Sequence, residues 1–261
     1  MKIGFIGMGN MAQAIVKGWK GTRAREAEEI LAYAPNRKKL KENAEKLGFT
    51  PMDSSLEVVE AADWVILACK PYQVESVLEE TGEALREKPL ISIALGWDYA
   101  HFLRRLGANQ RVRYIMPSTP AEVGEGVFLL EEAHSLRDEE AEISRLLFAG
   151  IGQVLVLPSH LMGIGGTLSG CGPAFADLMI EAFGDAGVKY GLPREAAYAL
   201  VSQMLLGAAK LQRDTKRHPG VLKDAVCSPG GSTIRGVTAL EAQGFRAACQ
   251  AAVDAVMQFR A

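Results

Sequence analysis

The chain has 261 residues, a length that fits one large domain or two ordinary ones. Hydrophobic residues make up 48% and charged residues 23%, which excludes a disordered chain, a collagen and a coiled coil. The net charge is −2 and the basic residues are spread along the chain, so nothing indicates a nucleic-acid partner. No segment reaches the roughly 18 apolar residues of a membrane span, and four separated cysteines without a CxxC pair favour neither a metal site nor disulfides. We therefore expect a cytoplasmic protein that contacts no membrane.

The first part of the chain alternates between strand and helix patterns. Short apolar runs predict six strands, at residues 2–6, 29–34, 64–69, 90–95, 112–116 and 154–157. Amphipathic spacing between them predicts helices at residues 11–19, 37–47 and 74–85. Such alternation is typical of an α/β fold with a mostly parallel, doubly wound sheet.

Beyond Pro158 the strand pattern stops, and helix periodicity interrupted by glycine continues to the end. Helices are expected behind Pro173, with an end at Gly187, and behind Pro193. Shorter helices are expected at residues 221–226, 233–242 and 245–259. We divide the chain into an α/β domain, residues 1–158, and an all-α domain, residues 159–261. Alone, the second domain would expose much apolar helix surface, which predicts that it dimerises.

A glycine-rich turn, residues 7–12 (GMGNMA), follows the first strand and opens the first helix. Gly7 allows a tight turn, Gly9 lets a pyrophosphate approach the backbone, and Ala12 lets the helix pack against the strand. A glycine turn without a ligand is the alternative. The position at the start of a βαβ unit favours a dinucleotide site.

The tip of the second strand distinguishes the two nicotinamide cofactors, because an acid there binds the ribose hydroxyls and repels a 2′-phosphate. The sequence at this tip is Ala34, Pro35, Asn36 and Arg37, without an acid. Asn36 can donate hydrogen bonds and Arg37 offers charge to a phosphate. The sequence favours NADPH over NADH, although Arg37 could also be the solvated start of a helix.

Two turns rich in glycine and hydroxyl groups precede helices in the second domain, at residues 169–173 (SGCGP) and 228–233 (SPGGST). Such turns direct N–H and O–H groups toward one point, which suits a small carboxylate, although Ser and Thr are also ordinary helix caps. We assign the first turn to close helix packing. For the second, binding and capping both remain open.

Residues 222–237 (LKDAVCSPGGSTIRGV), with LE at 240–241 and GFR at 244–246, resemble the signature of the pyrroline-5-carboxylate reductase family. Residues 3–11 (IGFIGMGNM), 68–71 (ACKP), 116–120 (MPSTP) and 168–175 (LSGCGPAF) are similar to the same family. The likeness covers essentially the whole chain in order. Ser118, Gly165 and Cys171 depart from the family pattern, where Asn, an acid and Ser are common.

The resemblance implies a Rossmann domain followed by an all-α dimerisation domain, assembled as an intertwined homodimer or a higher homo-oligomer. It implies hydride transfer from NADPH or NADH to the C=N bond of 1-pyrroline-5-carboxylate, giving L-proline in the last step of proline biosynthesis. By position, the implied cofactor contacts are Gly7, Met8, Gly9, Asn10, Met11, Ala34, Asn36, Arg37, Ser55, Ala68, Cys69, Lys70, Pro71 and Ala94. The implied substrate contacts are Ser228, Gly230, Gly231, Ser232 and Thr233.

Thr233 is the expected catalytic residue. The turn at residues 228–233 contains no His, Asp or Glu, so we expect no strong general acid to act directly. A hydroxyl is too weak an acid to donate alone, and Thr233 would hydrogen-bond the ring nitrogen and relay solvent protons.

Two other functions remain as alternatives. A β-hydroxyacid dehydrogenase needs a lysine on the helix after the Ser-Gly motif, and residues 173–185 contain none. A non-catalytic dinucleotide-binding redox sensor would not need the SPGGST turn.

Overall fold

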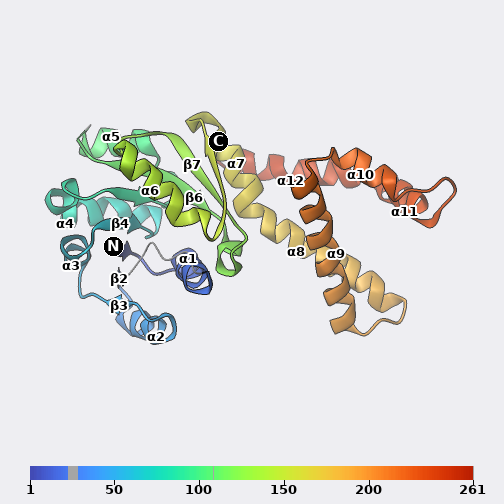
Figure 1. Cartoon of the computed structure of the whole chain (residues 1–261), viewed down its shortest axis with the longest axis horizontal. Coiled ribbons are helices and arrows are strands. Elements are labelled where there is room, and N and C mark those ends of the chain that lie inside the picture. Colours follow the sequence, from blue (N-terminus) through green and yellow to red (C-terminus); the bar gives the residue numbers. More distant parts are fainter. Residues whose placement is uncertain (23–28, 108, 261) are drawn as a thin grey trace. The chain divides into compact units, whose positions relative to one another are not determined.

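The computed structural model describes residues 1–22, 29–107 and 109–260, and contacts divide the chain into two compact units, Met1–Gly170 and Cys171–Ala261 (Figure 1). None of the described helices is long and apolar enough to cross a membrane.

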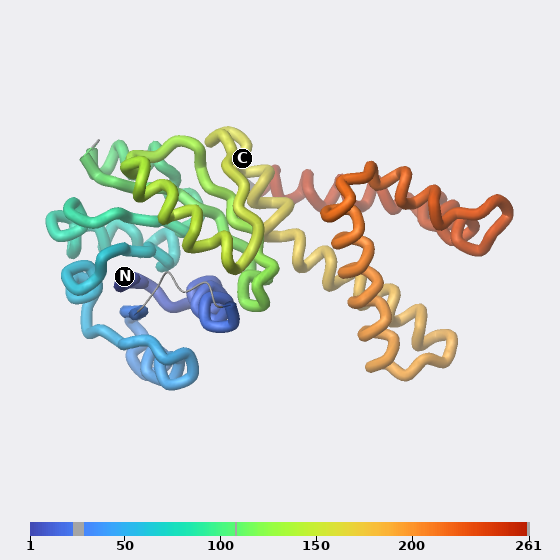
Figure 2. Tube along the Cα trace, in the orientation of Figure 1, coloured from blue at the N-terminus to red at the C-terminus, as the bar shows by residue number. Residues whose placement is uncertain are grey.

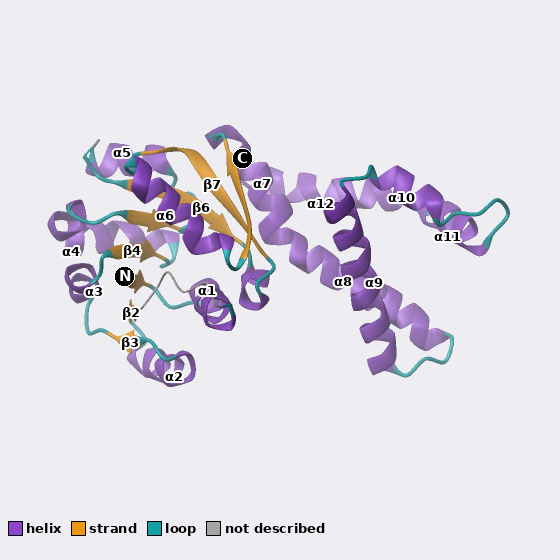
Figure 3. Cartoon of the chain, viewed as in Figure 1, coloured by secondary structure: helices purple, strands orange, loops and turns teal. Residues whose placement is uncertain are grey.

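A mostly parallel sheet forms the centre of the first unit (Figure 3). Its order is β3-β2-β1-β4-β5-β6-β7-β8, and β6 and β7 are the antiparallel neighbours. The strands are β1 (Lys2–Ile6), β2 (Glu29–Tyr33), β3 (Thr50–Pro51), β4 (Trp64–Leu67), β5 (Leu90–Ser92), β6 (Val112–Pro117), β7 (Gly126–His134) and β8 (Gly152–Leu157). The chain runs from β1 outward to β3 and then returns to β4 on the other side of β1. This reversal makes the carboxyl ends of β1 and β4 the switch point at which doubly wound sheets bind ligands.

Helices pack on both faces of this sheet. Strand β4 shows why, since Trp64 and Ile66 belong to one hydrophobic core while Val65 and Leu67 belong to another, as expected for side chains that alternate along a strand. The helices of the unit are α1 (Asn10–Gly21), α2 (Arg37–Leu47), α3 (Ser55–Ala61), α4 (Val74–Arg86), α5 (Tyr99–Leu106), α6 (Asp138–Ala149) and α7 (Met162–Gly166). The first core receives side chains from α1, α2 and α6, and the second from α3, α4 and α5.

The structure contains strands and helices in this unit that the sequence patterns do not indicate: β3, β7, α3, α5 and α6. In β7 the apolar run is interrupted by Glu131, which is nevertheless buried because its carboxylate accepts a hydrogen bond of 2.8 Å from the N–H of Tyr99. Ser118 is buried as well, and its hydroxyl accepts a hydrogen bond of 2.8 Å from the N–H of Val127. A Cβ on Gly165 would lie 2.7 Å from a terminal methyl carbon of Leu157 and 2.8 Å from one of Leu129, so a side chain here would require these two leucines to move.

The composition of the first glycine-rich motif, residues 169–173, predicted a turn at a helix start, and this prediction is wrong. Residues Thr167–Cys171 form a π-helical turn that directly precedes α8. The hydroxyls of Thr167 and Ser169 donate to the carbonyls of Gly163 and Gly165, each at 3.0 Å. These hydroxyls serve the helix backbone, whereas a Cβ on Gly170 or Gly172 would meet no atom within 4 Å, so among the described residues these glycines do not make the close packing that we expected.

The second unit consists of α8 (Gly172–Lys189), α9 (Arg194–Thr215), α10 (Pro219–Ala225), α11 (Ser232–Ala242) and α12 (Phe245–Arg260). Figure 2 traces α8 and α9 as an adjacent pair. Helix α8 continues past Gly187, the expected end, to Lys189, and a Cβ on Gly187 would lie 3.2 Å from Ala197 of α9 and 3.3 Å from Leu192 in the connecting loop. The turn after the helix is made by Gly191 at φ +95°.

The second unit has almost no core of its own. Among its described side chains and glycines, Gly184 and Ala197 are the two buried residues. Large apolar side chains such as Leu178 and Leu200 are 65% and 59% exposed. A monomeric domain rarely exposes so much apolar surface, so this unit needs a covering partner.

Candidate functional site

The glycine turn after β1 is built for close approach of backbone and ligand. Gly7 has φ +102°, donates a hydrogen bond of 2.7 Å to the carbonyl of Tyr33, and leaves no room for a side chain, because a Cβ would lie 2.6 Å from the backbone of Ala68. Gly9 precedes α1 and has no atom within 4 Å of its would-be Cβ, so the space before the helix start is open. An anion placed there would face the free N–H groups of α1.

The residues that follow Gly7 divide into exposed and buried ones. Asn10 is exposed at the first position of α1 and Met11 is half-buried. Met8 is buried in the core, so it can offer a ligand its backbone only. Its carbonyl accepts a hydrogen bond of 3.1 Å from Gln13, which fixes the turn.

A cavity of about 130 Å³ opens beside this turn. It brings together Gly7, Ser55 and Cys69, three of the expected cofactor contacts from separate parts of the sequence. Ser55 is 1% exposed, and its hydroxyl has no hydrogen-bond partner in the described structure. A buried hydroxyl without a partner is costly, so the cavity fits a ligand with a polar group at this point, as the ribose of a dinucleotide provides.

Three polar lining residues of the cavity, Gln73, Ser76 and Glu80, are absent from the sequence expectation. They lie on one face at the start of α4, at spacings of three and four residues. This periodicity is the signal that could have identified them, once α4 was known to begin at the switch point. Gln73 accepts a hydrogen bond of 3.1 Å from the N–H of Lys70 and so holds the loop after β4 in place.

The loop after β4 carries the other expected contacts. Burial raises the pKa of Cys69 to about 11, so its thiol stays protonated at neutral pH and is a packing group rather than a nucleophile. Lys70 and Pro71 are exposed. Ala94 after β5 is buried in the core on the α3–α5 face, which leaves its backbone for any ligand contact.

The charge at the tip of β2 differs from the charge that residues 34–37 alone predict. Ala34 is half-buried, and the side-chain oxygen of Asn36 caps α2 by accepting a hydrogen bond of 3.0 Å from Lys39. Arg37 forms an ion pair with Asp53, so the folded tip does carry an acid. Sequence reasoning missed Asp53 because the two-residue strand β3, which pairs with β2 and delivers it there, has no apolar pattern to reveal it.

The SPGGST motif of the second unit forms a turn that leads into α11. The N–H of Gly231 donates to the carbonyl of Ser228 at 3.0 Å, and Gly230 takes φ +70°. Ser232 and Thr233 lie in the first turn of α11, which contains no acid. Within the described residues, the exposed hydroxyls of Ser228, Ser232 and Thr233 have no intramolecular hydrogen bond, so they do not cap the helix and remain available to a carboxylate.

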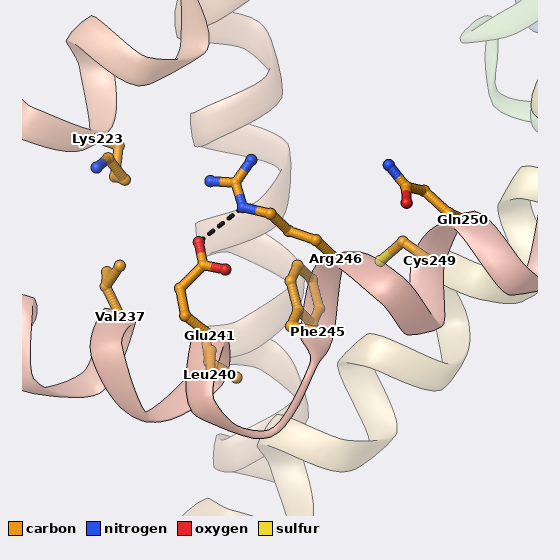
Figure 4. A pocket seen from close by; sticks show the side chains of 8 residues that line it. All are labelled: Lys223, Val237, Leu240, Glu241, Phe245, Arg246, Cys249 and Gln250. Atoms are coloured by element: carbon orange, nitrogen blue, oxygen red, sulfur yellow. Dashed lines mark hydrogen bonds and ion pairs between the residues drawn. The ribbon is translucent and has the colours of Figure 1, made fainter.

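A second cavity, of about 440 Å³, lies between α10, α11 and α12 (Figure 4). Glu241 and Arg246 point toward each other across it and form an ion pair of 2.7 Å. None of its lining residues comes from the SPGGST turn, so it is separate from the candidate substrate site.

Comparison with known proteins identifies the family of this chain. Residues 159–260 match the family model described as pyrroline-5-carboxylate reductase dimerisation, and residues 2–96 match the model described as NADP oxidoreductase coenzyme F420-dependent. A pyrroline-5-carboxylate reductase of Treponema pallidum is 40% identical over 98% of this chain and 99% of that protein. The chain belongs to the pyrroline-5-carboxylate reductase family. The Arabidopsis thaliana reductase is 38% identical over 97% of this chain and 92% of its own.

Solved reductase structures agree with the sequence relatives. The Plasmodium falciparum pyrroline carboxylate reductase with NADP bound covers 99% of this chain and 96% of its own, with a TM-score of 0.88 and 30% identity. The Streptococcus pyogenes reductase gives a TM-score of 0.87 and 31% identity over 99% of this chain and 97% of its own. A 3-hydroxyisobutyrate dehydrogenase of Mycobacterium tuberculosis reaches a TM-score of 0.52 at 16% identity over 77% of this chain and 70% of its own, a likeness of fold alone. The resemblance seen in the sequence motifs is therefore confirmed, and the dehydrogenase alternative has no support beyond the fold.

Proposed function

We propose that this chain reduces the C=N bond of 1-pyrroline-5-carboxylate to give L-proline, with NADPH or NADH as the hydride donor. The observation that carries the proposal is the intact SPGGST turn, with three hydroxyls that serve no structural bond, in a chain of this family. A redox sensor that only binds a dinucleotide would not need this turn.

The first unit fits the cofactor. The turn from Gly7 to Gly9 offers open backbone for a pyrophosphate, and Ser55 offers an unsatisfied hydroxyl in the adjoining cavity. Asn36 and Arg37 would contact the adenosine ribose. The nicotinamide end of the cofactor would be lined by residues that follow strands β4 and β5, namely Ala68, Cys69, Lys70, Pro71 and Ala94. When bound, the cofactor supplies the hydride, and the protein supplies position and electrostatics.

The second unit supplies the substrate groups. Free N–H groups at the start of α11, with Ser228 and Ser232, would hold the carboxylate, while Gly230 and Gly231 keep the backbone accessible. The Thr233 hydroxyl would hydrogen-bond the ring nitrogen and pass it a proton from solvent. Fixing two reactants in a reactive arrangement can lower a barrier by roughly 7–11 kcal/mol, so positioning accounts for much of the rate.

The family model of dimerisation supports a homo-oligomer, and we propose a homodimer as its basic unit. The near absence of a core in the second unit supports this assembly. We also propose that residues 1–158 form the cofactor domain and residues 159–261 the substrate domain; the dimerisation match begins at residue 159. Four free cysteines are consistent with the cytoplasmic location that the sequence predicts.

The decisive experiment follows nicotinamide absorbance in both directions. We expect oxidation of NADPH that depends on added 1-pyrroline-5-carboxylate at neutral pH, and reduction of NADP that depends on added proline at alkaline pH. The control omits the imine or the proline. Binding of NADPH without turnover in either direction would refute the reductase and favour a sensor.

A further inference from the structure

The pairing of β3 with β2 places an acid beside the proposed ribose site. Because Leu31 pairs with Thr50 and Ala32 with Pro51, the chain after β3 emerges next to the tip of β2. Arg37 lies four residues after Tyr33, the end of β2. Asp53 thereby reaches the guanidinium of Arg37 and forms an ion pair with it. The same guanidinium donates to the carbonyl of Met52.

The guanidinium is thus occupied from several sides. Besides Asp53 and Met52, the ring of Tyr33 lies under it, with 6.0 Å from the guanidinium carbon to the ring centroid. Asp53 itself is anchored by its backbone, whose N–H donates to Glu57 at 2.9 Å, while its side chain is 80% exposed. The carboxylate can therefore move while the backbone stays fixed.

These contacts bear on the choice between the two nicotinamide cofactors. A 2′-phosphate at the tip of β2 needs the charge of Arg37, which Asp53 neutralises, and it is also repelled by the carboxylate. A free 2′-hydroxyl, in contrast, can donate to that carboxylate. Asp53 opposes the phosphorylated cofactor and accepts the unphosphorylated one.

We propose that Asp53 determines the cofactor preference of this chain by competing with the 2′-phosphate for Arg37. The proposal depends on the dinucleotide site described above, and it concerns a residue that the reductase reaction itself does not need. It predicts a weaker preference for NADPH than the sequence of the β2 tip alone suggests.

The test measures the dissociation constants of NADPH and NADH by fluorescence titration of the full chain, without substrate. Replacing Asp53 by Asn (Asp53→Asn) is expected to raise the ratio of the NADH constant to the NADPH constant roughly five- to tenfold, as expected for one exposed charge close to a phosphate. Glu60→Gln is the matched control, since Glu60 is an exposed acid on α3 that makes no contact with Arg37. Its ratio should change by less than about twofold.

A second pair of variants tests the competition itself. On an Arg37→Gln background, Asp53→Asn should change the ratio clearly less than it does in the wild type, because the competition for Arg37 has gone and only the direct repulsion between the carboxylate and the phosphate remains. An unchanged ratio in Asp53→Asn, or an equal effect with and without Arg37, would overturn the proposal. Wild-type protein that binds neither nucleotide would instead refute the reductase function, so the two failures are distinguishable.

Discussion

Gly7 and Ala68 touch through their backbones at the switch point of the sheet: a Cβ on Gly7 would lie 2.6 Å from the carbonyl carbon of Ala68. This contact joins the ends of β1 and β4, and it leaves the adjoining Gly9 in open space. We therefore propose different roles for the two glycines, structural for Gly7 and ligand-facing for Gly9.

Gly7→Ala and Gly9→Ala are expected to separate these roles. Gly7→Ala forces both a backbone clash and a strained φ of +102°, and should lower the free energy of unfolding by about 1–3 kcal/mol or more while abolishing NADPH binding. Gly9→Ala should leave the unfolding midpoint nearly unchanged but weaken NADPH by about tenfold, equal to ~1.4 kcal/mol. Thermal unfolding and fluorescence titration measure the two effects. Equal losses of stability in both variants would contradict the distinction.

Ser55→Ala tests whether the unpartnered hydroxyl belongs to the cofactor. Removing a buried hydroxyl that has no partner should not lower stability, whereas losing its bond to the cofactor should raise the NADPH dissociation constant about three- to tenfold. Ser92→Ala is the control, since the buried Ser92 hydroxyl donates to the Trp97 carbonyl at 3.2 Å. That change should lower the unfolding midpoint and leave the dissociation constant unaltered. If Ser55→Ala binds NADPH as the wild type does, the hydroxyl is not a ligand.

Thr233→Val should lower kcat/KM for the imine by at least about tenfold, because the ring nitrogen loses its hydrogen bond and its path to solvent protons. The NADPH dissociation constant should stay the same. Thr238→Val on the same helix serves as the control, because the Thr238 hydroxyl donates to the carbonyls of Ile234 and Arg235 at 3.0 and 2.9 Å. Steady-state kinetics of both variants decide the matter: an unchanged kcat/KM in Thr233→Val rules out the role.

Leu178→Glu and Leu200→Glu place charges on the exposed apolar faces of α8 and α9. If these faces are covered by a second copy, each variant should sediment as a smaller species and lose activity, since a buried unpaired carboxylate is strongly unfavourable. Val123→Glu, at a site 76% exposed in the first unit, should leave the sedimentation coefficient unchanged. A wild-type chain that sediments as a fully active monomer would contradict the proposed assembly.

His134→Gln should flatten the pH dependence of stability. Burial, with the nearby charge of Arg113, lowers the pKa of His134 below 6.5, and its Nδ1 atom is buried without a hydrogen-bond partner. Near and below pH 6.5 the unfolded chain therefore binds a proton more readily than the folded chain. The free energy of unfolding consequently decreases as the pH is lowered. In urea titrations between pH 7 and 5, the variant should lose less stability than the wild type. The exposed His160, replaced by Gln, should reproduce the wild-type slope; a variant slope equal to wild type would show that His134 is not responsible.

Local patterns were sufficient where one short segment defines a structure. The predicted bounds of β1 and α2 agree with the structure, in which Gly48 follows α2 in the left-handed conformation. The family resemblance was also readable, because motifs such as residues 228–233 are contiguous. Function therefore followed from the sequence more directly than several elements of the fold.

Local patterns failed where stability comes from distant partners. Strand β3 has only two residues and exists because β2 lies beside it. Strand β7 contains the buried Glu131, whose carboxylate is satisfied by Tyr99, a residue far away in the chain. No window around either strand contains the atoms that stabilise it.

The sequence by itself determined the family, the glycine turn of the candidate cofactor site and the hydroxyl-rich turn of the candidate substrate site, because each depends on backbone freedom and side-chain chemistry within a few neighbouring residues. Only the tertiary structure decided what surrounds them. It showed that Ser55 is buried without a partner and that Asp53 reaches Arg37, since both facts depend on strands and helices that meet across the sheet. The charge at the tip of β2 is a property of two strands together, and β2 read alone misses the acid that we propose weakens the preference for NADPH.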